Sequence, residues 1–304
     1  MIRRPLKKKS FKHVDAVLCS DLHIRADIPE CRTDDFLQAQ EKKLKFIFDL
    51  CREYDCPLYI GGDIGHRSQW PNWLLEKFIS LALGVEIHAC FGQHDLPSHS
   101  TDLISKSAVG VLSTAGIIDA SEDYLGVRIF HYGQKIKNSG LCAFPYVALS
   151  HQLVIQDKED WPGQEAIKGI SLLKKHFVYK LILTGDNHKP FVVRYEGRLL
   201  VNPGSMMRTT ADQIDHKPRV YLWNQEQNDV IPIYLPIEED VIDRSHINIK
   251  KHNDDIAKRI EAFIEKMKSN DDFDISFEDN LKVFFRKNRV RKAVKEKIEG
   301  MING

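Results

Sequence analysis

Short apolar runs alternate with helical patterns through the early part of the chain, and this alternation most constrains its fold. Residues 16–19, 58–60 and 85–91 have the length and apolar content of buried strands. Apolar residues at helical spacing follow the first two strands, over 44–51 and 73–83. Alternation of this kind predicts strands that are buried between helices.

A different pattern begins near residue 179, where strands follow one another across short turns. Residues 181–184 form one expected strand, and 191–195 and 198–201 flank Glu196-Gly197, which predicts a hairpin. Another pair is expected over 219–223 and 230–235. Two sheets, each partly covered by helices, would accommodate both halves of this pattern.

The strand pattern ends in an acidic stretch after residue 235. Two amphipathic helices are expected beyond it, the first behind Asn253-Asp254-Asp255 and the second behind the capping box Ser276-Phe277-Glu278-Asp279. We therefore predict a main domain over 1–240 and a helical region over 241–304. The second helix is basic, which is consistent with a solvated face, with contact to DNA backbone, or with docking onto a partner protein.

Composition excludes some classes of protein. The 304 residues have a formal net charge of +1, so net charge does not indicate a polyanionic partner. The six cysteines form no C-x-x-C pair, and no apolar stretch approaches eighteen residues. We expect reduced thiols in a cytoplasmic protein, with neither secretion nor membrane insertion.

Four of the expected strands end in residue types that bind metals. An Asp or His that directly follows the end of a strand lies in the crevice at the edge of the sheet, where open α/β sheets bind ligands. One such group would carry no information, but four in order do. The four groups are Asp21-Leu22-His23, Gly62-Asp63 with His66, Gly92-Gln93-His94-Asp95, and Gly185-Asp186-Asn187-His188.

The chemistry of such a set is that of a pair of metal ions. Asp, His and carboxamide donors suit manganese, iron or zinc, and a shared carboxylate can hold two ions about 3.5–4 Å apart. Such a pair clamps a phosphate and stabilises the charge that develops during in-line attack. Each Asp or His alone would more often be a structural polar residue; the ordered set favours the metal site.

The order D-x-H, G-D, G-N-H-D/E, a lone His, then G-H-x-H resembles the calcineurin-like metallophosphoesterases, over roughly residues 14 to 235. Within it, Gly62-Asp63-Ile64-Gly65-His66 is similar to the G-D-x-x-H form of SbcD-type nuclease subunits of double-strand-break repair complexes. Asn202-Pro203-Gly204-Ser205 also recurs across the wider family. The resemblance implies a four-layer α/β/β/α sandwich, here with a helical C-terminal extension.

The resemblance also implies a role for each matching position. His94 would be the acid that assists the leaving oxygen, oriented by Asp95, and His66 would contact or position nucleic acid. The lone His is taken as His151, which follows an apolar run. The implied metal ligands are Asp21, His23, Asp63 and His188 at one ion, and Asp63, Gln93, His151 and Asp186 at the other.

Two positions depart from the family pattern. Gln93 stands where the family usually has Asn, and Asp186 stands where it usually has His. Because an anionic oxygen replaces an imidazole, our hypothesis is that the second site prefers manganese or magnesium to zinc. The alternative is a degenerate second site with weak catalysis.

The resemblance implies a metal-dependent DNA exonuclease and single-strand endonuclease of a repair or recombination complex. It also implies a dimer that works with an ABC-type ATPase, bound through the C-terminal helices; the chain has no G-x-x-x-x-G-K-[ST], so the ATPase would be a separate chain. One alternative is a phosphatase or small phosphodiesterase acting on nucleotides or phosphoproteins. Another is a catalytically silent subunit that binds DNA or a partner.

Overall fold

A computed structural model of the chain describes residues 11–124, 126–138, 146–156 and 166–245, with a few single positions from 285 onward. The chain divides into two compact units, Met1–Arg244 and Ser245–Gly304, and every helix and strand named here belongs to the first. The boundary expected near residue 240 and the two C-terminal helices stay predictions. Almost all of those helices lie outside the described residues.

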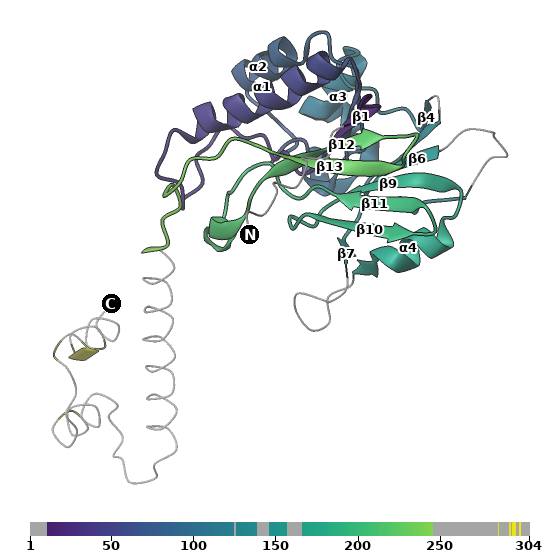
Figure 1. Cartoon of the computed structure of the whole chain (residues 1–304). Coiled ribbons are helices and arrows are strands. Elements are labelled where there is room, and N and C mark those ends of the chain that lie inside the picture. Colours follow the sequence, from purple (N-terminus) through teal and green to yellow (C-terminus); the bar gives the residue numbers. More distant parts are fainter. Residues whose placement is uncertain are drawn as a thin grey trace, which may run out of the picture. The chain divides into compact units, whose positions relative to one another are not determined.

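The first sheet has five strands and combines both ends of the main unit. Its first three strands in the chain are parallel, and a C-terminal hairpin is added antiparallel along β1 (Figure 1). The order across the sheet is β13 (Asp229–Tyr234), β12 (Arg219–Asn224), β1 (Ala16–Cys19), β2 (Leu58–Ile60) and β3 (Ile87–Ala89).

The second sheet has six strands, of which β11, β9, β6 and β5 are parallel to one another. The hairpin between β10 and β11 turns at Glu196 and Gly197, both with positive φ (48° and 71°), as a tight two-residue turn requires. The order is β10 (Phe191–Tyr195), β11 (Arg198–Asn202), β9 (Tyr179–Gly185), β6 (Tyr146–His151), β5 (Val127–Phe130) and β4 (Asp123–Tyr124). Two short strands, β7 (Val154–Ile155) and β8 (Ile167–Lys168), pair separately.

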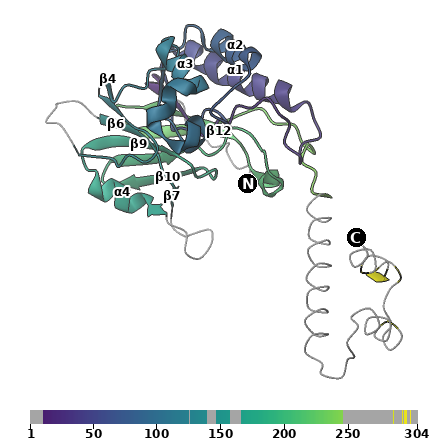
Figure 2. The ribbon, with the colours of Figure 1, turned by 180° about the vertical axis from the view of Figure 1, so that it is seen from behind.

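The two sheets are stacked face to face, with helices on both outer faces. Helices α1 (Phe36–Tyr54), α2 (Asn72–Ala82) and α3 (Ala108–Thr114) cover the first sheet, and α4 (Gly169–Lys175) covers the second (Figures 1 and 2). The architecture is therefore a four-layer α/β/β/α sandwich, as expected. In the part of the chain that the structure describes, four short 3-10 helices lie in the connections: η1 (Gln93–Asp95), η2 (Pro97–His99), η3 (Thr101–Lys106) and η4 (Ala211–Asp215).

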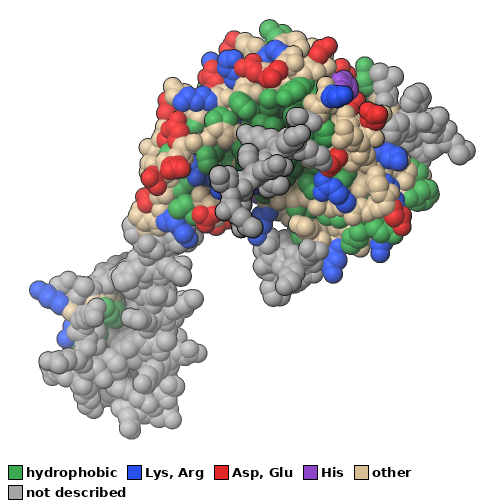
Figure 3. Space-filling view, in the orientation of Figure 1, with side chains coloured by type: hydrophobic (Ala, Val, Ile, Leu, Met, Phe, Trp, Pro, Cys, Tyr) green, Lys and Arg blue, Asp and Glu red, His purple; other side chains and the backbone are tan. Residues whose placement is uncertain are grey.

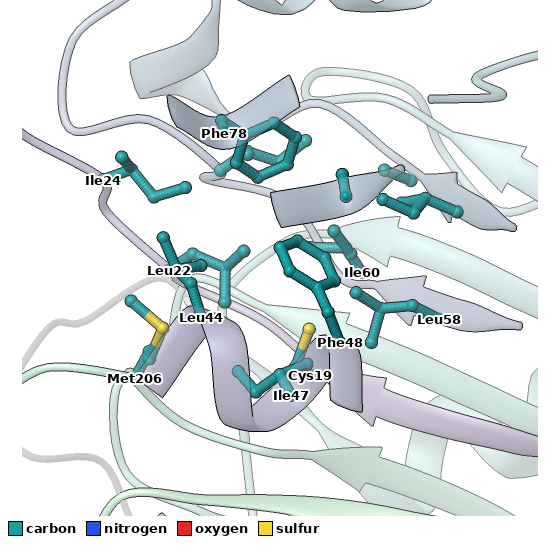
Figure 4. Close-up of a cluster of buried hydrophobic side chains, with 14 of the residues drawn as sticks. Cys19, Leu22, Ile24, Leu44, Ile47, Phe48, Leu58, Ile60, Phe78 and Met206 are labelled. Carbon is teal, nitrogen blue, oxygen red and sulfur yellow. The ribbon is translucent and has the colours of Figure 1, made fainter. Parts of the chain in front are cut away.

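Side chains of β1 point alternately to its two faces, and this explains how the layers are held together. Val17 and Cys19 face the helices, whereas Ala16 and Leu18 face the second sheet, and all four are buried. A strand with both faces covered reads as a continuous apolar run, which is why it could be recognised in the sequence. Figure 4 shows the core under the helices, where Phe48 from α1 meets Phe78 from α2.

Some elements were not anticipated. The observed β3 is shorter than the expected strand 85–91, and β9 is longer than 181–184. Helices α3 and α4 have seven residues each, too few to show helical periodicity. Strands β4, β7 and β8 have two residues each, too few to show an alternating pattern.

Charges of both signs are interspersed on the face of the molecule that Figure 3 shows. Acidic and basic side chains alternate over the described part of the face in Figure 3, in keeping with the small net charge of the whole chain. Among the described residues, no helix has the length and apolar character needed to cross a membrane.

Phe48→Ala tests the packing of the helices on the first sheet. Phe48 is fully buried, so its truncation should lower the free energy of unfolding by about 3–5 kcal/mol through lost burial and the cavity left behind. Leu83→Ala, at a position 60% exposed, should change it by less than about 0.5 kcal/mol. Denaturant midpoints measure both, and equal midpoints for the two variants would contradict the described core.

Candidate metal centre

Two glycines allow the carboxyl ends of strands from both sheets to meet. Gly61 follows β2 and Gly185 ends β9. A Cβ on Gly61 would lie 2.9 Å from the Thr184 carbonyl oxygen, and a Cβ on Gly185 would lie 2.3 Å from the Gly61 carbonyl oxygen. Because no other residue leaves room for this approach, glycine at both positions lets the backbones of the two sheets touch.

One half of the centre is formed by Asp21, His23 and His188. Nε2 of His23 lies 3.0 Å from Nε2 of His188. Oδ1 of Asp21 lies 4.0 Å from Nε2 of His23 and 3.9 Å from Nε2 of His188. One donor atom from each of the three residues therefore faces a common point, although the segment after β1 supplies two of them and the turn after β9 supplies the third.

Asp63 lies between this half and a second one. Its Oδ2 is 3.6 Å from Nε2 of His23 and 3.4 Å from Nε2 of His151. Its Oδ1 accepts a hydrogen bond from the backbone N–H of His94 at 3.0 Å. A Cβ on Gly92 would lie 2.0 Å from that same Oδ1, so the glycine makes space for the carboxylate. Asp63 therefore lies between His23 of the first half and His151 of the second.

His151, Gln93 and Asp186 complete the second half. Nδ1 of His151 donates to the Gly61 carbonyl at 2.8 Å, which turns Nε2 towards Asp63. Oδ1 of Asp186 lies 3.9 Å from that Nε2 and accepts a hydrogen bond from Nε2 of Gln93 at 2.8 Å. The two positions that depart from the family pattern therefore contact each other, and the Gln93 amide holds Asp186 in place.

Four of these residues have strained backbones. Asp21, His23, Asp63 and Asp186 have positive φ values of 50°, 44°, 49° and 76°. Side-chain-bearing residues rarely adopt this conformation, so four cases within one cluster show that the surrounding structure holds these residues in place.

Unsatisfied buried atoms test whether this site fits metal ions. Oδ2 of Asp21, Oδ2 of Asp63, Oε1 of Gln93 and Nε2 of His151 are all buried without a hydrogen-bond partner. Buried polar groups in proteins are nearly always partnered, and bound cations would satisfy four unpartnered atoms that are grouped around one carboxylate. Carboxylate, carboxamide and imidazole donors are also the types that divalent transition metals bind. The residues present fit two such ions.

The site is also electrostatically unusual. Burial, reinforced by neighbouring histidines, lowers the pKa of His23 to about 3. Burial raises the pKa of Asp21 and, together with the nearby Asp63, raises that of Asp95 to about 7. Burial alone would lower the pKa of His151, but the Asp63 carboxylate raises it to about 10. Without metal, a proton on His151 is thus the countercharge for Asp63.

The expected role of Asp95 needs a correction. We expected it to orient the His94 ring, but Nδ1–H of His94 donates to the His66 carbonyl instead, at 3.1 Å. The Asp95 carboxylate accepts hydrogen bonds from the backbone N–H groups of Ile64, Gly65 and Gly92, with N···O distances of 2.8–3.2 Å. A buried carboxylate needs such donors, and here they come from the loop that carries Asp63 and the loop that carries His94. Asp95 therefore holds these two loops together.

The predicted site residues otherwise lie together. The His66 and His94 rings are stacked, 5.7 Å apart, beside the His23 ring at 5.8 Å and 5.1 Å. Sequence reasoning missed the contributions of Gly61 and Gly185, whose sequence signal was their position directly after a strand or at its end. It also gave no role to Asn202 of the N-P-G-S motif, whose Nδ2 donates to the Asn187 and Lys189 carbonyls on either side of His188.

Neither a scan against protein-family models nor a search of curated proteins finds a match. Among solved structures, the chain is similar to an archaeal phosphodiesterase, at 13% identity and a TM-score of 0.40 over 72% of this chain and 99% of that one. It is also similar to protein TT1561 of Thermus thermophilus, at 12% identity and a TM-score of 0.45; the match covers 74% of this chain and 100% of that one. A third similar structure is that of a metallophosphoesterase from Sphaerobacter thermophilus, at 13% identity and a TM-score of 0.36; the match covers 73% of this chain and 89% of that one.

The His151–Asp63 pair predicts that metal binding releases a proton. At pH 8 the metal-free His151 is protonated, since its pKa is about 10, and an imidazole must lose that proton to bind a metal. Calorimetric titration with Mn²⁺ in two buffers of different ionisation enthalpy should give about one proton released per chain. Apparent affinity should rise with pH up to about 10.

His151→Asn should abolish the proton release, whereas His13→Gln, at an exposed position, should leave it unchanged. Tight Mn²⁺ binding by the wild-type chain at pH 8 with no proton released would contradict a protonated His151 that becomes a metal ligand.

Proposed function

We propose that this chain is a metal-dependent phosphoesterase that hydrolyses phosphodiester bonds. One observation supports this most strongly: donor atoms from both sheets are buried without a hydrogen-bond partner and grouped around the Asp63 carboxylate. A purely structural polar cluster would satisfy its own hydrogen bonds, whereas a metal site leaves those atoms for the ions.

The proposed ligands divide between two ions that share Asp63. Asp21, His23 and His188 would hold the first, and Gln93, His151 and Asp186 the second. When bound, such a pair of divalent ions clamps a phosphate, activates water as a nucleophile and offsets negative charge in the transition state. The chain's own contribution is to hold these donors on strand ends, with Asp95 and Gln93 fixing the loops and the Asp186 carboxylate.

His94 is the proposed general acid. Its Nδ1–H is committed to the His66 carbonyl, so Nε2 is the ring atom that can hold and deliver a proton. The ring is exposed, and it lies 5.1 Å from the ring of the ligand His23. A proton delivered from Nε2 to the leaving oxygen would complete cleavage of the ester.

The proposed natural substrate is DNA, cleaved as an exonuclease and single-strand endonuclease in a repair or recombination complex. The support is the Gly62-Asp63-Ile64-Gly65-His66 motif, which puts His66 beside His94. We also propose a dimer that works with a separate ABC-type ATPase. A nucleotide phosphatase or phosphodiesterase is the second candidate, because the same centre would serve either substrate.

The proposed metal is manganese or magnesium rather than zinc. Asp186 gives the second half an anionic oxygen donor where an imidazole would favour softer ions. An activity series across the divalent ions should therefore show more turnover with Mn²⁺ than with Zn²⁺.

Asp63→Asn and His94→Gln test the catalytic assignment. With Mn²⁺, the wild-type chain should cleave linear DNA and a small aryl phosphodiester. Asp63→Asn should remove detectable activity on both substrates, because the shared ligand loses its charge. His94→Gln should lower kcat by about 10²–10⁴ while leaving metal content unchanged, as expected for loss of an acid.

Asp49→Asn, an exposed matched control on α1, should behave as wild type. Rapid turnover of an aryl phosphomonoester without cleavage of DNA would favour the phosphatase. Silence on every substrate with full metal content would contradict the hydrolase and favour a binding subunit.

A further inference from the structure

A groove of about 260 Å³ opens directly beside the candidate metal centre. Its two sides come from the segments that follow His23 and Asp63 in the chain, and they are tied together where the His66 N–H donates to the Ile24 carbonyl at 3.0 Å. His66 borders both the groove and the centre, since its ring lies 5.8 Å from that of His23. The groove is lined chiefly by Ile24, Arg25, His66, Arg67, Trp70 and Leu74.

The indole of Trp70 is a fixed wall of this groove. Its Nε1 donates to the Arg67 carbonyl at 3.0 Å, and its ring packs edge-on against Phe78 with centroids 5.7 Å apart. A Cβ on Gly65 would lie 2.4 Å from Nε1, so the second glycine of the G-D-I-G-H motif makes room for the indole. Trp70 is only half-buried, which leaves part of an immobilised aromatic ring exposed to the groove.

Charge in the groove is placed at its rim. Arg25 is paired with Asp27, with 3.1 Å between Nε and Oδ1, so this pair is close to neutral. Arg67 is exposed and contributes further positive charge, while Ile24 and Leu74 form a buried apolar floor. An aromatic wall, an apolar floor and a cationic rim are together suited to a flat ring that is attached to an anion.

We propose that this groove binds the nucleoside next to the phosphoester that is cleaved, with the base against Trp70 and a phosphate near Arg67. The inference rests on the proposed function and narrows its substrate class to phosphoesters of nucleosides. A base that stacks on Trp70 must have a free face, so it must be unstacked from its neighbour on that side. Such a base comes from a single strand, a frayed end or a mononucleotide.

Two phosphodiesters with the same leaving group isolate the groove from the chemistry. One is methyl p-nitrophenyl phosphate, which has no nucleoside, and the other is the p-nitrophenyl phosphate ester of thymidine. Trp70→Ala should lower kcat/KM for the thymidine ester by about 5- to 150-fold, the loss expected for one stacked base, and leave the methyl ester unchanged. Trp73→Ala, an exposed tryptophan three residues away, should alter neither value.

Two further variants guard against a folding artefact. Trp70→Phe keeps an aromatic face and should recover most of the thymidine-ester activity. Arg67→Gln removes charge without touching the carbonyl that fixes the indole. Because neither ester carries a phosphate beyond the one that is cleaved, this variant should leave turnover of both esters unchanged and weaken only the binding of thymidine 5′-phosphate. Calorimetry of the metal-free chain with thymidine 5′-phosphate gives a readout without turnover: binding should occur in wild type and Trp73→Ala and be lost in Trp70→Ala.

The outcomes separate this inference from the proposed function. Equal loss on both esters in Trp70→Ala, or no loss on either, overturns the nucleoside groove while wild-type turnover of the methyl ester leaves the phosphoesterase intact. Absence of wild-type turnover on both esters, with thymidine 5′-phosphate still bound, overturns the phosphoesterase but not the groove. Competition against turnover of the thymidine ester identifies where the natural base comes from. Stronger inhibition by oligothymidylate than by thymidine 5′-phosphate indicates a nucleic-acid strand, and the reverse indicates a mononucleotide.

Discussion

The backbone contact between Gly61 and Gly185 is the constraint on which the rest of the site depends. Strand ends of the first sheet supply Asp21, His23 and Asp63, and those of the second supply His151, Asp186 and His188. These two sets can share ligands only if the sheets converge at this edge, and a single Cβ at either glycine would force them apart. The hydrogen bond from His151 to the Gly61 carbonyl then fixes the imidazole across the junction. The layered fold thus brings the proposed metal ligands together at the point where the two sheets approach each other most closely.

That convergence concentrates negative charge in a buried place. Asp21, Asp63 and Asp95 are all fully buried within the same few loops. Asp95 is stabilised by three backbone N–H groups, and in the metal-free chain Asp63 is stabilised by protonated His151. Oδ1 of Asp21 accepts the backbone N–H of Asp186 at 3.0 Å, whereas its Oδ2 has no hydrogen-bond partner. Because a buried carboxylate with few donors is costly, the arrangement favours binding of cations, and the positive φ of Asp21 and Asp63 is maintained by the surrounding packing.

Much of this could be predicted from the sequence, for identifiable reasons. The strand at Ala16–Cys19 is buried on both faces, so its apolar run was visible, and the residues that follow such strands must lie at one sheet edge. The bond between Gln93 and Asp186 could not be foreseen, because each position was judged singly and their contact depends on the fold. The role of Asp95 was misjudged because adjacency in sequence to His94 is not contact between side chains. The groove at Trp70 was also missed, since it is made by two segments that are distant in the chain.

The most direct test of the account is the number and position of metal ions around Asp63. Crystals grown with manganese and measured at its absorption edge should show two anomalous peaks about 3.5–4 Å apart, with the Asp63 carboxylate contacting both. One peak on the side of Asp21, His23 and His188 would mean that the second half is degenerate and that Gln93 and Asp186 satisfy each other. Peaks away from Asp63, or none, would contradict the central claim.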